Sequence, residues 1–149
     1  MTARPLAAAL AALIALPLAA QEPSFGGRTL DEWQAVLKSD EVPRKRRAAV
    51  VALGQIALGT DKKDTIQAAM VPVGRALRTD ASPVVRQQAA VVIGQQKVDE
   101  AAPAVVTDLV EAMRGERETD VRKEVAVAVG RYGKRAAQAV APLTAALKD

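Results

Sequence analysis

The amino-acid sequence predicts an all-α protein, an α-solenoid of about three stacked helix pairs with one leading helix. The first observation is composition: half of the 149 residues are apolar, but only Phe25, Trp33 and Tyr132 are aromatic. A core built from Ala, Val and Leu favours many closely packed helices over a strand-rich sandwich. The second observation is a nine-residue motif that occurs three times, beginning with arginine and ending with glycine. Its glycines are 40 and 36 residues apart, which is the period of a helical repeat.

Residues 1–20 have the plan of a secretory signal peptide. Sixteen of these residues are apolar and the only charged one is Arg4. The apolar run from Leu6 to Leu16 is shorter than the roughly 20 residues that a membrane span needs, which argues against a permanent anchor. We expect cleavage after Ala20 and an exported chain, periplasmic or secreted. Removal of Arg4 lowers the formal net charge from +4 to +3, which is too small to require a polyanionic partner.

The chain after the signal divides into a leader and a repeat domain. Residues 21–28 are rich in Pro and Gly, and we expect a flexible leader there. The repeat domain is predicted over residues 29–149 and opens with a helix of about ten residues. Thr29 and Glu32 have the spacing of a capping box, which marks the start of this helix. Its apolar face consists of Leu30, Trp33 and Leu37.

Three repeats are predicted over about 39–78, 79–114 and 115–149, each with two helices. The first helix of each repeat contains the motif and places aliphatic side chains every three to four residues, as a core-facing helix requires. The three copies of the motif are residues 46–54, 86–94 and 122–130.

Capping residues and prolines indicate where the helices begin. Ser82 followed by Pro83 is typical of an N-cap and first helical residue, and Thr119 is expected to cap the corresponding helix of the third repeat. Each second helix contains one proline. Pro72 lies deeper than a first-turn proline if its helix begins at Thr65, so this helix either begins later or kinks there. The three prolines are Pro72, Pro103 and Pro142.

The repeat resembles a known family. The pattern Val-Arg-x-x-Ala-Ala-x-x-x-Gly, with Ala-x-Pro-x-Leu in the partner helix, is similar to HEAT repeats, and most of all to the short subtype named after phycobilisome lyases. The resemblance extends over about residues 29–149, and its best matches are residues 85–94 and 121–130. Lys45, which stands where an aliphatic residue is usual before Arg46, departs from the pattern. The resemblance implies a right-handed solenoid with an extended surface suited to holding another macromolecule.

Charged residues also recur at fixed positions of the repeat. An arginine begins each motif, and an acidic residue lies six residues before it. Because stacked repeats place like residues in columns, we expect an arginine–carboxylate ladder between repeats, a role that the resemblance also implies. An anion-binding stripe is the alternative interpretation. The residues of the expected ladder are Arg46, Arg86 and Arg122 with Asp40, Asp80 and Glu116.

The densest run of charge is Arg44 to Arg47, at a predicted helix start, where basic residues oppose the helix dipole. A solvated helix face is the plain interpretation of this run. The alternative is a surface for an acidic protein or a polyanion. The candidate partner surface consists of Arg44, Lys45, Arg47, Lys134 and Arg135.

The sequence contains no Cys and no His, which excludes thiolate nucleophiles, histidine bases and Cys/His zinc sites. Its carboxylates lie mostly at predicted helix starts, where the helix dipole explains them. We therefore expect no catalytic residue, no metal and no cofactor. The leading hypothesis is an exported protein-interaction scaffold or adaptor without catalysis of its own. The alternatives are a polyanion-binding module that uses Arg44–Arg47 and a non-catalytic subunit of an enzyme complex.

The expected partner is another protein, since export argues against nucleic acid and no stable membrane span would remain after signal cleavage. The C-terminal helix is a candidate surface for self-association. Asp149 falls at a predicted repeat boundary, and small residues lie on the side that a following repeat would cover. These small residues are Ala137, Ala141 and Ala145.

Overall fold

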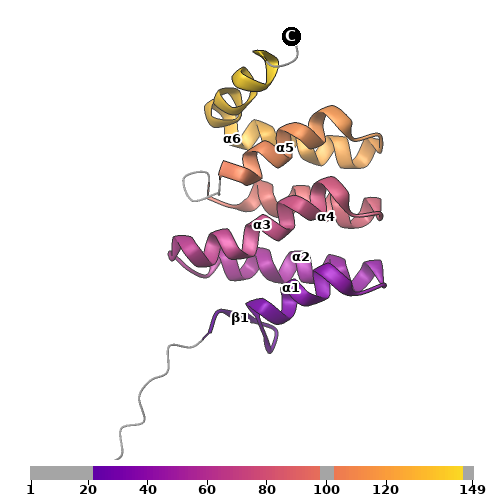
Figure 1. Ribbon diagram of the computed structural model, residues 1–149, viewed down its shortest axis with the longest axis vertical. Helices are drawn as coiled ribbons and strands as arrows, with labels where there is room; N and C mark the ends of the chain where they lie inside the picture. The colour runs from indigo at the N-terminus through magenta and orange to yellow at the C-terminus, as the bar shows by residue number, and fades with distance from the viewer. Residues whose placement is uncertain (1–21, 98–102, 146–149) are drawn as a thin grey trace, which may run out of the picture.

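The structure is a computed structural model that describes residues 22–97 and 103–145, with the side chains of 103–104 and 134–145 outside the description. In this part of the chain six helices are stacked along the long axis, from α1 at one end to α6 at the other (Figure 1). The predicted all-α solenoid is thereby confirmed. The helices are α1 (Leu30–Ser39), α2 (Pro43–Leu58), α3 (Lys63–Thr79), α4 (Pro83–Gln95), α5 (Pro103–Gly115) and α6 (Thr119–Ala145).

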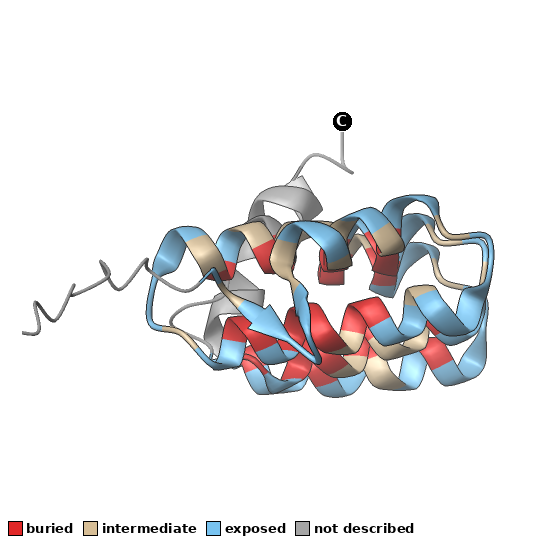
Figure 2. Ribbon diagram, turned by 90° about the horizontal axis from the view of Figure 1, so that it is seen from below, coloured by how far each residue is buried: buried red, intermediate tan, exposed pale blue. Residues whose placement is uncertain are grey.

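The helices form two layers (Figure 2). We call α2, α4 and the part of α6 before Gly133 the A layer, and α1, α3 and α5 the B layer. The core lies between the layers, and its largest fully buried side chains are aliphatic, as the composition predicts. Each helix pair packs on the next, so the core is one continuous seam along the stack. Leu53, Ile66, Leu77, Ile93 and Leu109 lie in this seam.

The two helices of the third pair follow one another within α6 and are separated by a kink at Gly133. In α6 the helical dihedral angles are interrupted only at Gly133, with φ 47° and ψ −121°. Glycine adopts a positive φ at little steric cost. In the third repeat Gly133 therefore turns the chain between the two helices, as the loop of residues 59–62 does between α2 and α3 in the first repeat.

Residues 24–29 correct the expectation of a flexible leader over 21–28. Strand β1 (Ser24–Phe25) pairs antiparallel with β2 (Arg28–Thr29), with Ser24 opposite Thr29. Gly26 and Gly27 form the turn, with φ values of 58° and 79° that favour glycine.

This hairpin packs on the free end of the stack below α1 (Figure 1). The indole nitrogen Nε1 of Trp33 donates a hydrogen bond to the carbonyl of Phe25 at 2.9 Å. The guanidinium of Arg28 lies 5.0 Å from the centre of the Trp33 ring, within the range of a cation–π contact. The hairpin thus serves as a cap for this end, where a preceding A-layer helix would otherwise be needed.

Helix α3 begins at Lys63 and continues through Pro72, so the interpretation of a later start is wrong. Because proline has no N–H, the carbonyl of Ala68 loses its helical donor. The side-chain amide of Gln34, on α1, donates to this carbonyl at 2.8 Å. A residue on the neighbouring B-layer helix therefore makes the proline tolerable.

Replacing Gln34 by Ala is expected to lower the free energy of unfolding by about 1 kcal/mol, because the part-buried carbonyl of Ala68 is left without a donor. Pro72→Ala restores a backbone donor, so the cost of Gln34→Ala should disappear in that background. Urea denaturation followed by circular dichroism measures both. Gln67→Ala, at an exposed position of α3, is the control and should change the stability by less than about 0.5 kcal/mol. An undiminished cost in the Pro72→Ala background would contradict the pairing.

Of three expected helix caps, one is present as predicted. The capping box of α1 is formed: Glu32 N–H donates to Thr29 Oγ1 at 3.3 Å, and Thr29 N–H donates to Glu32 Oε2 at 2.7 Å. The side chain of Ser82 makes no cap bond; instead Asp80 Oδ1 accepts from the Ser82 N–H at 2.8 Å. Thr119 is the first residue of α6 and not its cap. The carboxylates in the inter-repeat loops therefore take the capping role that we expected of the hydroxyls.

Successive A-layer helices approach closely at the motif glycines. A Cβ atom at Gly54 would lie 2.4 Å from Val92 Cγ1, and one at Gly94 would lie 3.2 Å from Ala128 Cα. Both glycines are buried, so any larger side chain would push neighbouring helices apart. At Gly130, which is exposed, no described atom lies within 4 Å of the corresponding position.

Two buried polar side chains also join the A-layer helices. The Tyr132 hydroxyl donates to the carbonyl of Ile93 at 2.9 Å, and burial raises the pKa of Tyr132 to about 12. The amide of Gln96 donates to the carbonyls of Val92 and Gly54 at 3.2 and 3.4 Å. No buried side-chain nitrogen or oxygen in the described part of the chain lacks a partner.

Several predictions from the sequence concern residues outside the described part. These are the signal segment 1–20 with its cleavage after Ala20, the side chains of Lys134 and Arg135, and the alanine face and Asp149 at the C-terminal end. Among the residues that are described, no helix is long and apolar enough to cross a bilayer.

Candidate interaction surface

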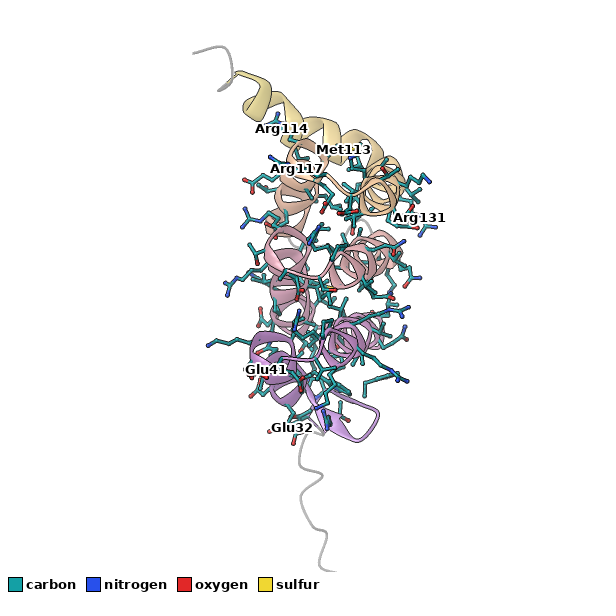
Figure 3. The ribbon with its side chains drawn as sticks, turned by 90° about the vertical axis from the view of Figure 1, so that its right-hand side faces the viewer. Glu32, Glu41, Met113, Arg114, Arg117 and Arg131 are labelled. Atoms are coloured by element: carbon teal, nitrogen blue, oxygen red, sulfur yellow. The ribbon has the colours of Figure 1, made fainter. Side chains whose placement is uncertain are left out.

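The loops that lead from the B layer into the A layer lie above one another along one side of the stack. Figure 3 looks onto this side, with Glu41 in the first loop and Arg117 in the third. Each loop contains an acidic residue next to the end of a B-layer helix, and the following A-layer helix contains the motif arginine in its first turns. The repeat thus brings arginines and carboxylates to the same edge.

Arg46 joins the first two loops. Its Nε and NH2 atoms each lie 2.8 Å from a carboxylate oxygen of Asp80, in a two-pronged ion pair. Its NH1 atom donates to the carbonyls of Asp40 and Glu41 at 2.9 and 3.1 Å. Only 14% of the Arg46 side chain and 7% of the Asp80 side chain are exposed, so the pair is largely shielded from water.

Arg86 repeats this arrangement one layer further along. Its Nε and NH2 atoms donate to Glu116 at 2.7 and 3.1 Å, and its NH1 donates to the carbonyls of Asp80 and Ala81 at 2.8 and 3.3 Å. Arg46 and Arg86 therefore each bind the backbone of the loop before their own helix and the carboxylate of the equivalent loop in the next repeat. This is a ladder that joins consecutive repeats.

The ladder shifts the pKa values of its members. The Arg86 guanidinium, and then the N–H groups of Glu118 and Arg117, hold the pKa of Glu116 below its usual value against the opposing effect of burial. Burial is the largest influence on Asp80 and would raise its pKa, but Arg46 and the Ser82 N–H together lower it. The same hydrogen bonds raise the pKa values of Arg46 and Arg86. Both pairs are therefore ionised at neutral pH.

The ladder expected between repeats does not include its two end members. The carboxylate of Asp40 binds no arginine; it accepts from the Val42 N–H at 2.9 Å and forms an ion pair with Lys45 at 3.3 Å. Arg122 donates to the carbonyls of Glu116 and Arg117 and to the Thr119 hydroxyl, but no described carboxylate pairs with it. The two pairs that are formed, Arg46–Asp80 and Arg86–Glu116, each join an arginine to the acidic residue of the next repeat.

The basic run Arg44–Arg47 is largely engaged within the protein. Arg46 belongs to the ladder, Lys45 pairs with Asp40, and the Nε of Arg47 donates to the Gln88 side chain at 2.9 Å. Arg44 is exposed and makes no hydrogen bond or ion pair with another described residue. The four cations therefore do not form one free patch. Sequence reasoning could not foresee this, since their partners lie on other elements.

A groove of about 870 Å³ lies between α1 and α3 in the B layer. Its apolar lining comes from Leu37 on α1 and from Val71 and Pro72 on α3. The Arg46–Asp80 pair closes it at the loop end. It is a concave, partly apolar surface of the kind that binds another molecule.

Two cations on opposite sides of the groove have no close partner. Lys38 on α1 and Arg75 on α3 both line it and are exposed, and the side chain of neither forms a hydrogen bond or ion pair with a described residue. Arg75 acts on the more distant Asp108 only through its charge. These two residues lie 37 positions apart in the sequence, so only the stacking of α1 on α3 brings them together.

At the next interface of the B layer, between α3 and α5, the corresponding cation has carboxylate partners. Arg78 on α3 reaches α5, where its Nε lies 2.7 Å from Asp108 and its NH1 contacts Glu111. Asp108 is half-buried, and burial raises its pKa despite the neighbouring Arg78. By contrast, no described acidic side chain pairs with Lys38 or Arg75. The groove therefore holds two unpaired cations beside an apolar floor, with the exposed carboxylate of Glu41 and the paired carboxylates of Asp40 and Asp80 at its loop end.

Among the described residues, no group of three or more carboxylates could hold a metal ion.

Residues 71–149 match the family model of HEAT repeats. No curated protein and no solved structure matches the chain. HEAT repeats commonly mediate protein–protein interaction and are generally not catalytic. With its match over more than half of the sequence and its stack of helix pairs, the chain belongs to the HEAT-repeat family.

Proposed function

We propose that this protein is an exported interaction module that holds another protein in the groove between α1 and α3, without catalysis of its own. The observation that carries the proposal is the pair of unpartnered cations, Lys38 and Arg75, above an apolar floor. A partner segment with apolar residues and one or two carboxylates would satisfy both features. A rigid stack supports such a site, because few groups must be ordered on binding.

The proposed export rests on the segment 1–20, whose charge, apolar run and Pro17 fit a signal peptide. The relation to the short phycobilisome-lyase subtype likewise stays a prediction from the motif. Polyanion binding through Arg44–Arg47 has less support, because three of these four side chains have partners within the protein. A role as a non-catalytic subunit of an enzyme complex is a special case of protein binding.

The proposal can be tested by photo-crosslinking in the cells that make the protein. A photoreactive residue in place of Gln67, on the rim of the groove, is expected to give a covalent adduct with one exported protein. The double substitution Lys38→Glu/Arg75→Glu should reduce this adduct about tenfold, because both attractive charges become repulsive. The matched control is Arg44→Glu/Lys123→Glu, which reverses two exposed A-layer charges and should leave the adduct unchanged.

Three outcomes would overturn the proposal. The first is an adduct that is insensitive to the groove charges. The second is an adduct lost only in the A-layer variant, which would favour the basic run. The third is an intact chain recovered from the cytosol, because export predicts a mass that lacks residues 1–20.

A further inference from the structure

Among the described residues, the outward edge of α6 lacks three features of α2 and α4: an arginine–carboxylate pair with the following loop, a side chain packed on the motif glycine, and a partly buried valine three residues before it. This edge is distinct from the groove between α1 and α3. Helices α1 and α6 lie at opposite ends of the stack (Figure 1). The two preceding layers show what occupies the equivalent position, so the repeat itself describes the missing neighbour.

The first missing contact is that of the motif arginine. Arg46 and Arg86 each use Nε and NH2 to bind a carboxylate of the following loop. Arg122 retains the bonds to the backbone of its own preceding loop, but its Nε has no acceptor among the described residues. Arg122 is exposed, whereas Arg46 and Arg86 are partly buried.

The second and third missing contacts are apolar. Val92 packs on Gly54 and Ala128 packs on Gly94, whereas Gly130 is exposed and has no described atom packed on it. The valine three residues before the motif glycine changes in the same way. Val127 is 52% exposed, whereas its counterparts in the two preceding repeats are partly buried. These counterparts are Val51 and Val91.

The spacing of the two contacts defines the neighbour. In the closed layers the carboxylate and the side chain on the glycine belong to one segment and are twelve residues apart, as Asp80 to Val92 and as Glu116 to Ala128. The segment is an acidic loop followed by a helix with a small or β-branched residue at the contact. Any partner that repeats this geometry satisfies the open guanidinium and covers the apolar edge.

The opposite end of the same chain has this spacing too, with Asp40 and Ala52. Ala52 is only 1% exposed, however, and the hairpin of β1 and β2 packs against α2 at that end (Figure 2). A second copy therefore cannot stack there without displacing the hairpin. The hairpin therefore covers the end of the stack at α1, whereas no described residue covers the outward edge of α6.

We propose that the outward edge of α6 docks a helix of a different protein, one that follows an acidic loop. A carboxylate of that loop pairs with Arg122, and a small apolar residue twelve positions later packs on Gly130.

The absence of cysteine from the natural chain makes disulfide trapping a clean test. The probe is a synthetic peptide with the sequence of residues 78–96, which carries both Asp80 and Val92. A Cβ placed at Gly54 lies 3.5 Å from the Cβ of Val92, which is within the range of a disulfide. Full-length Gly130→Cys protein is mixed with Val92→Cys peptide in a glutathione buffer. The peptide is used at millimolar concentration because a free helix of this length is only marginally stable.

We expect the mixed disulfide to form at least about tenfold more with the Val92→Cys peptide than with a Val91→Cys peptide. Ala126→Cys protein, with its cysteine at another exposed position of α6, should trap the peptide equally poorly. Asp80→Asn in the peptide or Arg122→Gln in the protein should lower the yield about tenfold, whereas Arg114→Gln should not. Equal yields at all positions, or yields indifferent to Arg122, would overturn the proposal.

Two further outcomes would identify another occupant and also overturn it. If Gly130→Cys protein forms disulfide dimers without peptide, the edge is occupied by a second copy. If Asp149→Asn raises the yield of trapped peptide, the chain's own last residue already pairs with Arg122. The groove crosslink at Gln67 should persist in Arg122→Gln protein, so a failure at α6 is separable from a failure at the groove.

Discussion

Replacing Arg46 by methionine is expected to lower the free energy of unfolding by about 3 kcal/mol. The substitution leaves the carboxylate of Asp80, 7% exposed, without its two-pronged partner, and it removes donors from two backbone carbonyls of the first loop. Methionine retains the length and apolar character of the arginine stem, so the loss reports on the guanidinium. Chemical denaturation monitored by circular dichroism measures the change.

The chain provides the control for this prediction. Arg122 occupies the same place in its repeat and binds backbone in the same way, but it pairs with no described carboxylate and is exposed. Arg122→Met should therefore cost less than about 1 kcal/mol. A cost equal to that of Arg46→Met would mean that the backbone bonds, and not the ion pair, stabilise the stack.

The same pair predicts a dependence on pH. The pKa of Asp80 is lowered in the folded protein, so its contribution to stability is present above the unfolded pKa of about 3.9 and is lost as the pH falls through the lowered value. In Arg46→Met the burial of Asp80 is no longer offset by a cation, and its pKa should rise. The difference in stability between the two proteins should therefore shrink below about pH 4. A difference that is constant from pH 7 to pH 3 would contradict the ionic origin of the effect.

Replacing Gly54 by leucine is expected to destabilise the protein by about 3 kcal/mol. A Cβ at this position would already lie 2.4 Å from Val92 Cγ1, and the branched valine side chain has little room to move away. The helices α2 and α4 must then separate, which opens gaps in a core that is otherwise closely packed. Gly54→Ala should fall between the wild type and the leucine variant in thermal or urea denaturation.

Gly130 ends the same motif in the third repeat and supplies the matched control. No described atom lies within 4 Å of a Cβ at this position, so a leucine there meets open space. Because leucine favours the helix over glycine, Gly130→Leu should raise the stability by up to about 1 kcal/mol. A loss of stability in purified Gly130→Leu protein would show that this edge is already covered in solution, by a second copy or by another part of the chain, and is not open to a partner.

Much of the fold could be predicted from the sequence because its information is local and repeated. The aliphatic stripe of 3.6-residue period, the capping box at Thr29 and Glu32, and the recurring arginine and glycine each act within a few residues. The expectation at 21–28 failed because the hairpin depends on Trp33, in the following helix, for one of its hydrogen bonds. Proline and glycine in that segment indicated a turn or a loop equally well.

The candidate surfaces were less predictable. The sequence indicated an arginine–carboxylate ladder between repeats, but not which of its members would pair. Arg46 binds Asp80 and Arg86 binds Glu116, 34 and 30 residues later, whereas the Asp40 carboxylate and Arg122 stay outside the ladder. It offered Arg44–Arg47 as a free cluster, whereas three of these side chains are engaged by residues on other elements. It did not indicate the groove at all, since Lys38 and Arg75 become neighbours only when α1 and α3 are stacked.

By itself, then, the sequence determined the class of fold and the repeat, because composition and periodicity act through short-range preferences. The tertiary structure decided which carboxylate pairs with which arginine, on which motif glycine a neighbouring side chain packs, and which cations have no partner among the described residues. Those outcomes depend on the distance and rotation between stacked helix pairs. Loop length and side-chain packing across the whole seam determine these quantities, and no single repeat contains them.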